Sequence, residues 1–239
     1  MQTKEIISHS WEKALRQELS TILKDKYKQI EKLRQTGELV LPVEEENSGI
    51  YNALSSVDFE NVKVLIIGQD PYPNIEDAHG LAFSKKTGKC PASLKNIFAK
   101  IKEETGIENT NANLTHWAQQ GVLLLNRALT FTKTETLAKR VKFWAPVVDG
   151  IIEKLLNRNT PLVVILWGNQ ANEIEQFKKT KDNILVLRSS HPSNMGNAKN
   201  TPIMDGKIPA FTQAKLFSKC NEFLKQNGLK EIDWSTQLK

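Results

Sequence analysis

The stretch VKVLIIGQDPYPNIEDAHGLAFS, residues 62–84, decides the fold of this chain because an apolar run passes directly into a polar, turn-rich segment. The run VKVLII (62–67) has no polar alternation, which is typical of a strand buried on both faces. The prolines, glycines and aspartates that follow it favour turns over a longer strand. We therefore expect a buried strand that ends in a loop with a function of its own.

Three further apolar runs resemble the first, and segments with helical spacing separate them. The runs are VLLL (122–125), LVVILW (162–167) and ILVL (184–187), and apolar residues repeat with helical period over 94–101, 147–156 and 216–224. Ser93 is the expected N-cap of the helix over 94–101, and Gly106 its C-terminal stop. Strands that alternate with helices predict a central four-stranded, mostly parallel twisted sheet flanked by helices, a single α/β domain over residues 1–239. Residues 1–50 are predicted to form an N-terminal helical layer, with a helix from Trp11 to about Arg34.

Length, composition and charge narrow the class of protein. The chain has 239 residues, 39% of them apolar, which suits one domain with a sizeable core. Its two cysteines, Cys90 and Cys220, form no CxxC pair, so we expect neither a disulfide framework nor a zinc site. No apolar run approaches the roughly 20 residues that cross a bilayer, and the first residues lack the apolar region of a signal peptide, so a cytoplasmic protein is expected. The net charge of +6 favours nucleic acid as a partner.

All four apolar runs end in polar, turn-forming residues. They are followed by GQDPYP, NRALT, GNQA and RSSHPSNMG, and the carboxyl ends of parallel strands meet at one edge of a sheet, where ligands bind. Asp70, Asn126 and His191 are therefore expected to converge there, and Phe83 could stack on a planar ring. The phosphate-binding loop and the dinucleotide motif are both absent. A ring held by stacking, read by a carboxamide and released as an anion indicates a nucleobase.

At these residues the chain resembles the family 1 uracil-DNA glycosylases. GQDPY (68–72), AHGLAFS (78–84), LLLN (123–126) and HPS (191–193) are similar to that family's water-activating loop, uracil-stacking segment, uracil-reading strand end and DNA intercalation loop. Weaker similarities, in the family's order, are SWEKAL (10–15), PASLKNIF (91–98), WG (167–168) and IDW (232–234). The resemblance spans essentially the whole chain. It implies a DNA-repair enzyme that flips a deoxyuridine out of DNA, hydrolyses its N-glycosidic bond and leaves an abasic site.

The resemblance also implies a role for each residue of the pocket. The catalytic residues would be Asp70, which stabilises the sugar cation and directs water to C1′, and a neutral His191, which donates to O2 of the uracil anion. The substrate-binding residues would be Gln69, Tyr72, Phe83 and Asn126. Among them Phe83 would stack on uracil, Asn126 would pair with O4 and N3–H, and Tyr72 would stand where the thymine methyl must go. No metal or organic cofactor is expected.

The DNA itself would be held by loops around the pocket. The resemblance assigns phosphate contacts to Pro91, Ser93, Gly168, Asn169 and Ser193, and places Met195 as the wedge that fills the vacated base stack. The expected partner is uracil-containing DNA, single- or double-stranded, and a proteinaceous glycosylase inhibitor is a further candidate. We expect a monomer.

The chain departs from the family in four places. Pro73 stands where the family usually has His, and HPSNMG replaces the usual HPSPLS. The segment 197–213 is longer than usual, and TKTETLAKRVKFW (132–144) has no clear counterpart. We interpret the basic stretches LAKRVK (137–142) and KKTK (178–181) as solvated faces rather than DNA contacts.

Each candidate residue also has an ordinary structural interpretation. Asp70 could be a turn residue, His191 a structural hydrogen-bonding group, Asn126 a turn cap, Phe83 and Tyr72 core aromatics, and Met195 a surface residue; His79 is interpreted as structural. Two rival functions stay open. One is a catalytically impaired DNA-binding homologue of the same fold, and the other is a glycosylase of broader or shifted base specificity.

Overall fold

A computed structural model describes residues 7–46, 48–196, 198, 201–203 and 206–237, and its centre is the predicted four-stranded sheet. The strands are β1 (Val64–Gly68), β2 (Val122–Asn126), β3 (Leu162–Trp167) and β4 (Ile184–Ser189), in the order β2-β1-β3-β4. All three strand pairings are parallel, so all four carboxyl ends lie at one edge. The predicted fold class and the shared edge are confirmed.

Burial of the strands differs from the prediction at β4. Every residue of β1, β2 and β3 is buried, whereas three of the six residues of β4 are only half-buried. The prediction that β4 is covered on both faces is wrong because β4 forms one edge of the sheet. At the other edge β2 stays covered, since Ala82 N–H donates to Leu124 O at 3.0 Å and the short helices α2 (Asn52–Ser55) and α4 (Thr115–Gln119) pack against it.

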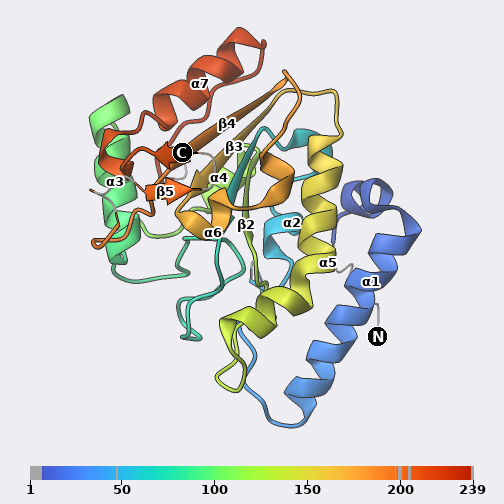
Figure 1. Cartoon of the computed structure of the whole chain (residues 1–239). Coiled ribbons are helices and arrows are strands. Elements are labelled where there is room, and N and C mark those ends of the chain that lie inside the picture. Colours follow the sequence, from blue (N-terminus) through green and yellow to red (C-terminus); the bar gives the residue numbers. More distant parts are fainter. Residues whose placement is uncertain (1–6, 47, 197, 199–200, 204–205, 238–239) are drawn as a thin grey trace.

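Two layers of helices enclose the sheet. Figure 1 shows α1 (His9–Gln35) and α5 (Leu137–Leu156) side by side on one face, with α3 (Ala92–Thr105) and α7 (Phe217–Gln226) on the other. The helix predicted from Trp11 to about Arg34 is present, with a kink at Arg16, whose φ of 56° is not helical. Residues 36–46 and 48–50 of the expected helical layer are not helical. Gly106 ends α3 with φ at 78°, as predicted. The N-cap prediction is wrong, because α3 begins at Ala92 after Pro91 and Ser93 lies in its first turn.

Short elements complete the chain. They are η1 (Phe59–Asn61), α6 (Asn169–Asn172), η2 (Glu175–Phe177), β5 (Thr201–Ile203), β6 (Gly206–Ile208) and η3 (Phe211–Gln213). Within the predicted long segment 197–213, β5 and β6 form an antiparallel pair, while residues 197, 199–200 and 204–205 lie outside the described residues. Cys90 and Cys220 are free cysteines. Among the described residues, no helix is long and apolar enough to cross a membrane.

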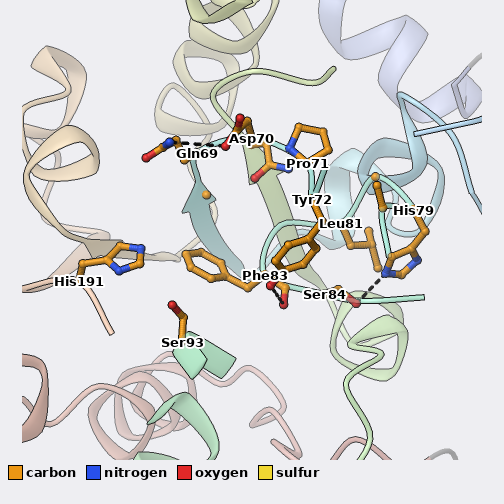
Figure 2. A pocket seen from close by; sticks show the side chains of 14 residues that line it. Gln69, Asp70, Pro71, Tyr72, His79, Leu81, Phe83, Ser84, Ser93 and His191 are labelled. Carbon is orange, nitrogen blue, oxygen red and sulfur yellow. Dashed lines mark hydrogen bonds between the residues drawn. The ribbon is translucent and has the colours of Figure 1, made fainter. Parts of the chain in front are cut away.

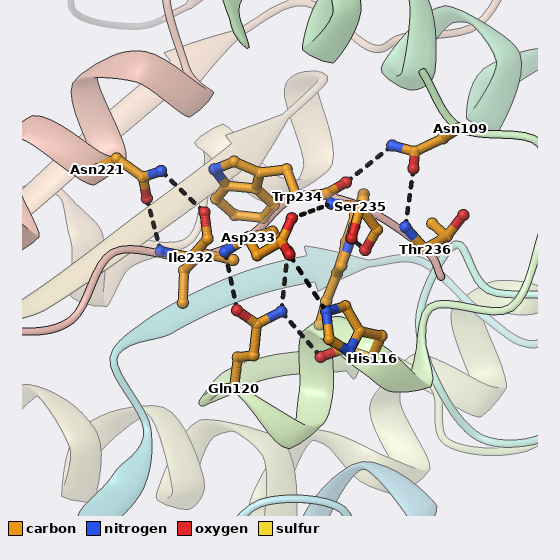
Figure 3. Close-up of polar contacts among 10 residues, drawn as sticks. Asn109, His116, Gln120, Asn221, Ile232, Asp233, Trp234, Ser235 and Thr236 are labelled. Carbon is orange, nitrogen blue, oxygen red and sulfur yellow. Dashed lines mark hydrogen bonds and ion pairs between the residues drawn. The ribbon is translucent and has the colours of Figure 1, made fainter. Parts of the chain in front are cut away.

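Three carboxamide side chains form hydrogen bonds with the backbone of residues 232–236, near the end of the chain. We call residues 232–236 the C-terminal strap (Figure 3). Asn221 accepts from Ile232 N–H and donates to Ile232 O, both at 2.9 Å, and Gln120 does the same with Asp233 at 2.8 Å. Asn109 donates to Trp234 O and accepts from Thr236 N–H, again at 2.8 Å. Each amide thus serves as one step of a sheet ladder and holds Trp234 in the core.

Candidate active site

The polar groups predicted to converge line one cavity at the carboxyl edge of the sheet (Figure 2). Asp70 comes from the loop after β1, Asn126 ends β2, and His191 follows β4. The cavity measures about 210 Å³, below the roughly 300–1,000 Å³ of pockets that hold drug-sized ligands. Its wall includes Gly68, Gln69, Pro71, Tyr72, Ala78, His79, Gly80, Leu81, Phe83, Ser84 and Ser93. A small polar ligand fits a site of this size and composition.

Asn126 is held beside the start of the first loop by strand register. Gly68 lies opposite Asn126 in the β1–β2 ladder. A Cβ at Gly68 would come within 2.3 Å of Asn126 Oδ1 and 2.7 Å of Ala82 Cβ, so only glycine allows this approach. Asn126 is 5% exposed, and its carboxamide has no hydrogen-bond partner among the described residues. A buried, unpaired amide that faces a cavity is available to a ligand.

Phe83 is held in the cavity by one contact to its ring and one to its backbone. Trp167 packs edge-on against it with 5.0 Å between ring centroids, and Tyr72 donates its hydroxyl to Phe83 O at 3.2 Å. Phe83 has φ of 62°, a strained conformation for a bulky residue, and such strain clusters at binding sites. Burial, with a smaller contribution from Asp77, raises the pKa of Tyr72 to about 12. Tyr72 therefore stays a protonated, firmly placed wall.

His191 is arranged as a neutral hydrogen-bond donor. Ser193 N–H donates to His191 Nδ1 at 3.1 Å, so Nδ1 is the unprotonated nitrogen and the proton of the neutral ring sits on Nε2. Burial lowers the pKa of His191, which favours this neutral form. Gly168 lies behind the ring with φ at 80°, and a Cβ there would come within 3.1 Å of His191 Cβ.

The loop that carries His191 is anchored by residues that the sequence analysis did not single out. Asn96 on α3 donates from Nδ2 to Pro192 O at 2.7 Å and to Asn194 Oδ1 at 3.0 Å. Ser190 Oγ donates to Gly196 O at 2.7 Å and closes the loop. Met195 projects from this loop with 86% of its surface exposed. A firm base with an exposed apolar tip suits the wedge role predicted for Met195, which stays a prediction.

The residues predicted to hold phosphates lie around the cavity. Ser93 lines it, and Pro91 caps α3 two residues before. Gly168 and Asn169 line an adjoining cavity of about 230 Å³ that also contacts Phe83 and His191. Their contacts with DNA stay predictions. His79 is buried and bonds Ser84 Oγ at 2.7 Å, in keeping with its structural interpretation, and the lysines of KKTK are exposed as predicted.

One prediction about charge is wrong. LAKRVK (137–142) begins α5, and within it Arg140 is buried rather than solvated. Arg140 Nη2 donates to Asp70 Oδ2 at 2.6 Å. The sequence carries a signal for this, because Arg140, Trp144, Val148 and Ile151 continue one helical stripe at spacings of four, four and three.

Comparisons with known proteins agree on one family. The model of the uracil DNA glycosylase superfamily matches residues 55–225. Uracil-DNA glycosylases of Bacillus licheniformis and Oceanobacillus iheyensis are 37% and 36% identical, and the alignments cover 97% and 94% of this chain and 98% and 96% of those proteins. The crystal structure of mimivirus uracil-DNA glycosylase is similar in fold, with a TM-score of 0.77 at 22% identity over 97% of this chain and 95% of that one. The chain belongs to the uracil DNA glycosylase superfamily.

Proposed function

We propose that this chain excises uracil from DNA at the cavity described above, with Asp70 and His191 as its catalytic residues. The family and the similarity to glycosylases along nearly the whole chain support the reaction. The observation that carries the residue assignment is that Asp70, Asn126 and His191 line one small cavity although they come from three different strand ends. The product would be free uracil and an abasic site in the DNA.

Recognition of uracil rests on three side chains of the cavity. Asn126, with its buried and unpaired amide, presents a donor and an acceptor that match O4 and N3–H of uracil and mismatch cytosine. Phe83 stacks on the ring. Tyr72 fills the position that a thymine methyl would need, and its hydroxyl is tied to Phe83 O, so the wall does not yield. Gln69, the fourth substrate-binding residue, lines the same cavity.

Cleavage places opposite charges on the two halves of the substrate. The sugar gains oxocarbenium character, which the Asp70 carboxylate stabilises while it directs a water molecule to C1′. The departing base becomes an anion, and His191 Nε2–H donates to its O2 atom. A neutral imidazole suits this role because burial keeps its pKa low, so it donates a hydrogen bond without transferring its proton at neutral pH.

The base reaches this cavity only after leaving the duplex stack. We infer that the nucleotide is flipped outward and that Pro91, Ser93, Gly168, Asn169 and Ser193 grip the phosphates on either side. Met195 then enters the gap in the stack. The net charge of +6 supports attraction to the DNA backbone.

The two free cysteines bear on the cellular setting of the protein. We propose a monomer that acts in the cytoplasm, where its two free cysteines stay reduced. A structure similar to this chain is that of a single-substitution variant of mimivirus UNG in complex with UGI. That complex supports a protein partner of the same kind as a further ligand of this chain.

An oligonucleotide assay tests the proposed function. The protein is incubated with a single-stranded oligonucleotide that contains one deoxyuridine, in the presence of a chelator, and abasic sites are then cleaved with alkali. Strand scission at dU, with none at dT or dC in matched oligonucleotides, is the expected result. Scission at dT or dC would indicate the shifted specificity instead, and binding without scission would indicate a catalytically impaired homologue. No comparison favours either alternative.

A further inference from the structure

We call the carboxyl edge of the sheet, with its cavity and the loops around it, the catalytic edge. Arg140 contacts this edge although it belongs to α5 and not to the loops or strand ends that form the cavity. Its side chain is 6% exposed and reaches from α5 to Asp70 Oδ2, at 2.6 Å from Nη2. Nη1 donates to Thr132 O at 3.2 Å and Glu135 O at 2.5 Å, and the guanidinium stacks on the Phe131 ring, 4.7 Å from its centroid. Among the described residues, Asp70 is the one carboxylate in an ion pair with Arg140.

A second buried arginine shows what a purely structural role looks like in this molecule. Arg158 donates to the backbone carbonyls of Phe59 and Val62 and stacks on the Phe59 ring, 5.2 Å from its centroid. No carboxylate forms an ion pair with Arg158 among the described residues. Two carbonyls and one ring are therefore enough to hold a buried arginine in this fold. The feature that Arg140 has in addition is its contact with Asp70.

The loop around Asp70 offers few donors of its own. The next residue, Pro71, and the nearby Pro73 have no backbone N–H, so neither can hold the carboxylate. Within the loop, Gln69 Nε2 contacts Asp70 Oδ1, but only at 3.5 Å, the outer limit for a hydrogen bond. The short contact to Asp70 is the one that Arg140 makes. It engages Oδ2 and leaves Oδ1 free of the guanidinium.

We propose that Arg140 is a positioning residue for uracil excision. Its guanidinium, fixed by two carbonyls and a ring, fixes the plane of the Asp70 carboxylate so that Oδ2 is occupied and Oδ1 serves the water and the sugar cation. The inference rests on the proposed role of Asp70. Loss of such positioning lowers kcat, because misplacing a reacting group by about 1 Å can cost roughly 10²-fold in rate. KM changes little, since uracil is bound by Asn126, Phe83 and Tyr72.

The first test compares matched arginine variants on a single-stranded dU oligonucleotide. Arg140→Met is expected to lower kcat by about 10²-fold with KM within about threefold of wild type. Arg140→Lys keeps a donor for Oδ2 and is expected to lose only about tenfold. Arg158→Met, the control, is expected to lower the melting temperature at least as much as Arg140→Met while kcat stays within threefold of wild type. An Arg140→Met enzyme with wild-type kcat, or equal losses of kcat in the two Met variants, would overturn the inference.

A double-variant cycle tests whether Arg140 acts through Asp70. In the Asp70→Asn background, Arg140→Met is expected to lower the remaining rate by no more than about threefold, because the carboxylate it positions is already gone. A further loss of about 10²-fold would place the action of Arg140 elsewhere and overturn the inference.

Failure of a variant to fold and failure of the proposed function can each be distinguished from failure of the inference. If Arg140→Met does not fold, Arg140→Lys decides, and a wild-type kcat for that variant overturns the inference. If the wild-type protein releases no uracil, the proposed function fails first and the inference falls with it; wild-type activity with unaffected Arg140 variants leaves the proposed function standing.

Discussion

The catalytic edge and the C-terminal strap use the same three kinds of side chain for opposite purposes. The strap region contains Asp233, His116 and three carboxamides, and each carboxamide both donates to and accepts from the backbone of residues 232–236 (Figure 3). At the catalytic edge the Asn126 amide is unpaired among the described residues, and His191 accepts one hydrogen bond at Nδ1. The difference lies in the carboxamides, which are paired with the backbone at the strap and unpaired among the described residues at Asn126.

This difference indicates which region of the molecule carries a cost in folding stability for the sake of function. A buried polar group without a partner costs about 1–3 kcal/mol, and functional sites are among the places where a fold retains one. The carboxamides at the strap all have backbone partners, so mutations there should lower the stability of the fold. The catalytic edge should respond through turnover. Three matched pairs of residues, one from each region, test this division.

The largest effect is expected at the aspartates. Asp70→Asn should lower kcat about 10²–10⁴-fold, because an uncharged amide can neither stabilise the sugar cation nor direct the attacking water as well. Asp233→Asn makes the same chemical change in the strap and should leave kcat within threefold of wild type. Single-turnover rates on a dU oligonucleotide measure both. Similar losses of kcat in the two variants would show that the two regions do not differ in this way.

The histidines should give the next largest effect. His191→Leu should lower kcat about 10²–10³-fold through loss of the donor to the uracil anion, with an unchanged circular dichroism spectrum. His116→Leu, on α4 beside the strap, should lower the melting temperature instead, because His116 Nε2 lies 3.8 Å from Asp233 Oδ2 and the side chain is mostly buried. A near-normal rate for His191→Leu would remove its catalytic role.

The pH dependence of the reaction follows from the lowered pKa of His191. Neutral His191 is the active form, so kcat should be constant near neutral pH and fall only on the acid side, below the ordinary histidine pKa of about 6.5. Folding stability should change in the same direction. The unfolded chain takes up the proton first as the pH falls, so the contribution of His191 is complete above about pH 6.5 and declines below it. Rate–pH profiles of wild type and His191→Leu check this, and the acid-side step assigned to His191 should be missing from the variant.

The two asparagines should give the clearest separation between an effect on activity and an effect on stability. Both effects should be smaller than those at the aspartates and histidines. Asn126→Leu removes two hydrogen bonds to uracil and should lower kcat/KM about ten- to a hundredfold while the fold is at least as stable, since its amide has no protein partner to lose. Asn221→Leu leaves the N–H and C=O of Ile232 unpaired and should lower the free energy of unfolding by about 1–3 kcal/mol with little change in kcat/KM. Urea denaturation and steady-state kinetics on both variants give the comparison.

Much of the catalytic edge could be predicted from the sequence because it follows from strand order. The apolar runs give the strands, parallel strands share a carboxyl edge, and Asp70, Asn126 and His191 each follow such a run. The burial of β4 could not be predicted in this way, since nothing in ILVL tells an edge strand from a central one.

The contacts that cross between distant elements were harder to predict. Arg140 sits in a basic stretch that resembles a solvated face, and only its place on the stripe with Trp144 indicates burial. Two of the three strap amides, Asn109 and Gln120, bind backbone 113 to 127 residues further along the chain, and no local pattern marks an amide that binds a distant backbone. The periodicity of a sequence predicts which face of a helix or strand is buried. It does not predict which distant residue a buried polar side chain will bind, because that depends on the completed fold.

Met195 offers the smallest effect and the finest test of the catalytic edge. Its side chain is 86% exposed on a loop held by Asn96 and Ser190, so Met195→Ala should alter neither the pocket nor the fold. Only duplex DNA has a stack for the side chain to enter, so kcat/KM should fall by about three- to tenfold on duplex dU and by less than twofold on single strands. Leu33→Ala, an exposed apolar residue on α1, is the control and should leave both substrates unaffected. Equal losses on the two substrates would remove Met195 as the wedge, because an effect that does not need a base stack cannot come from filling one.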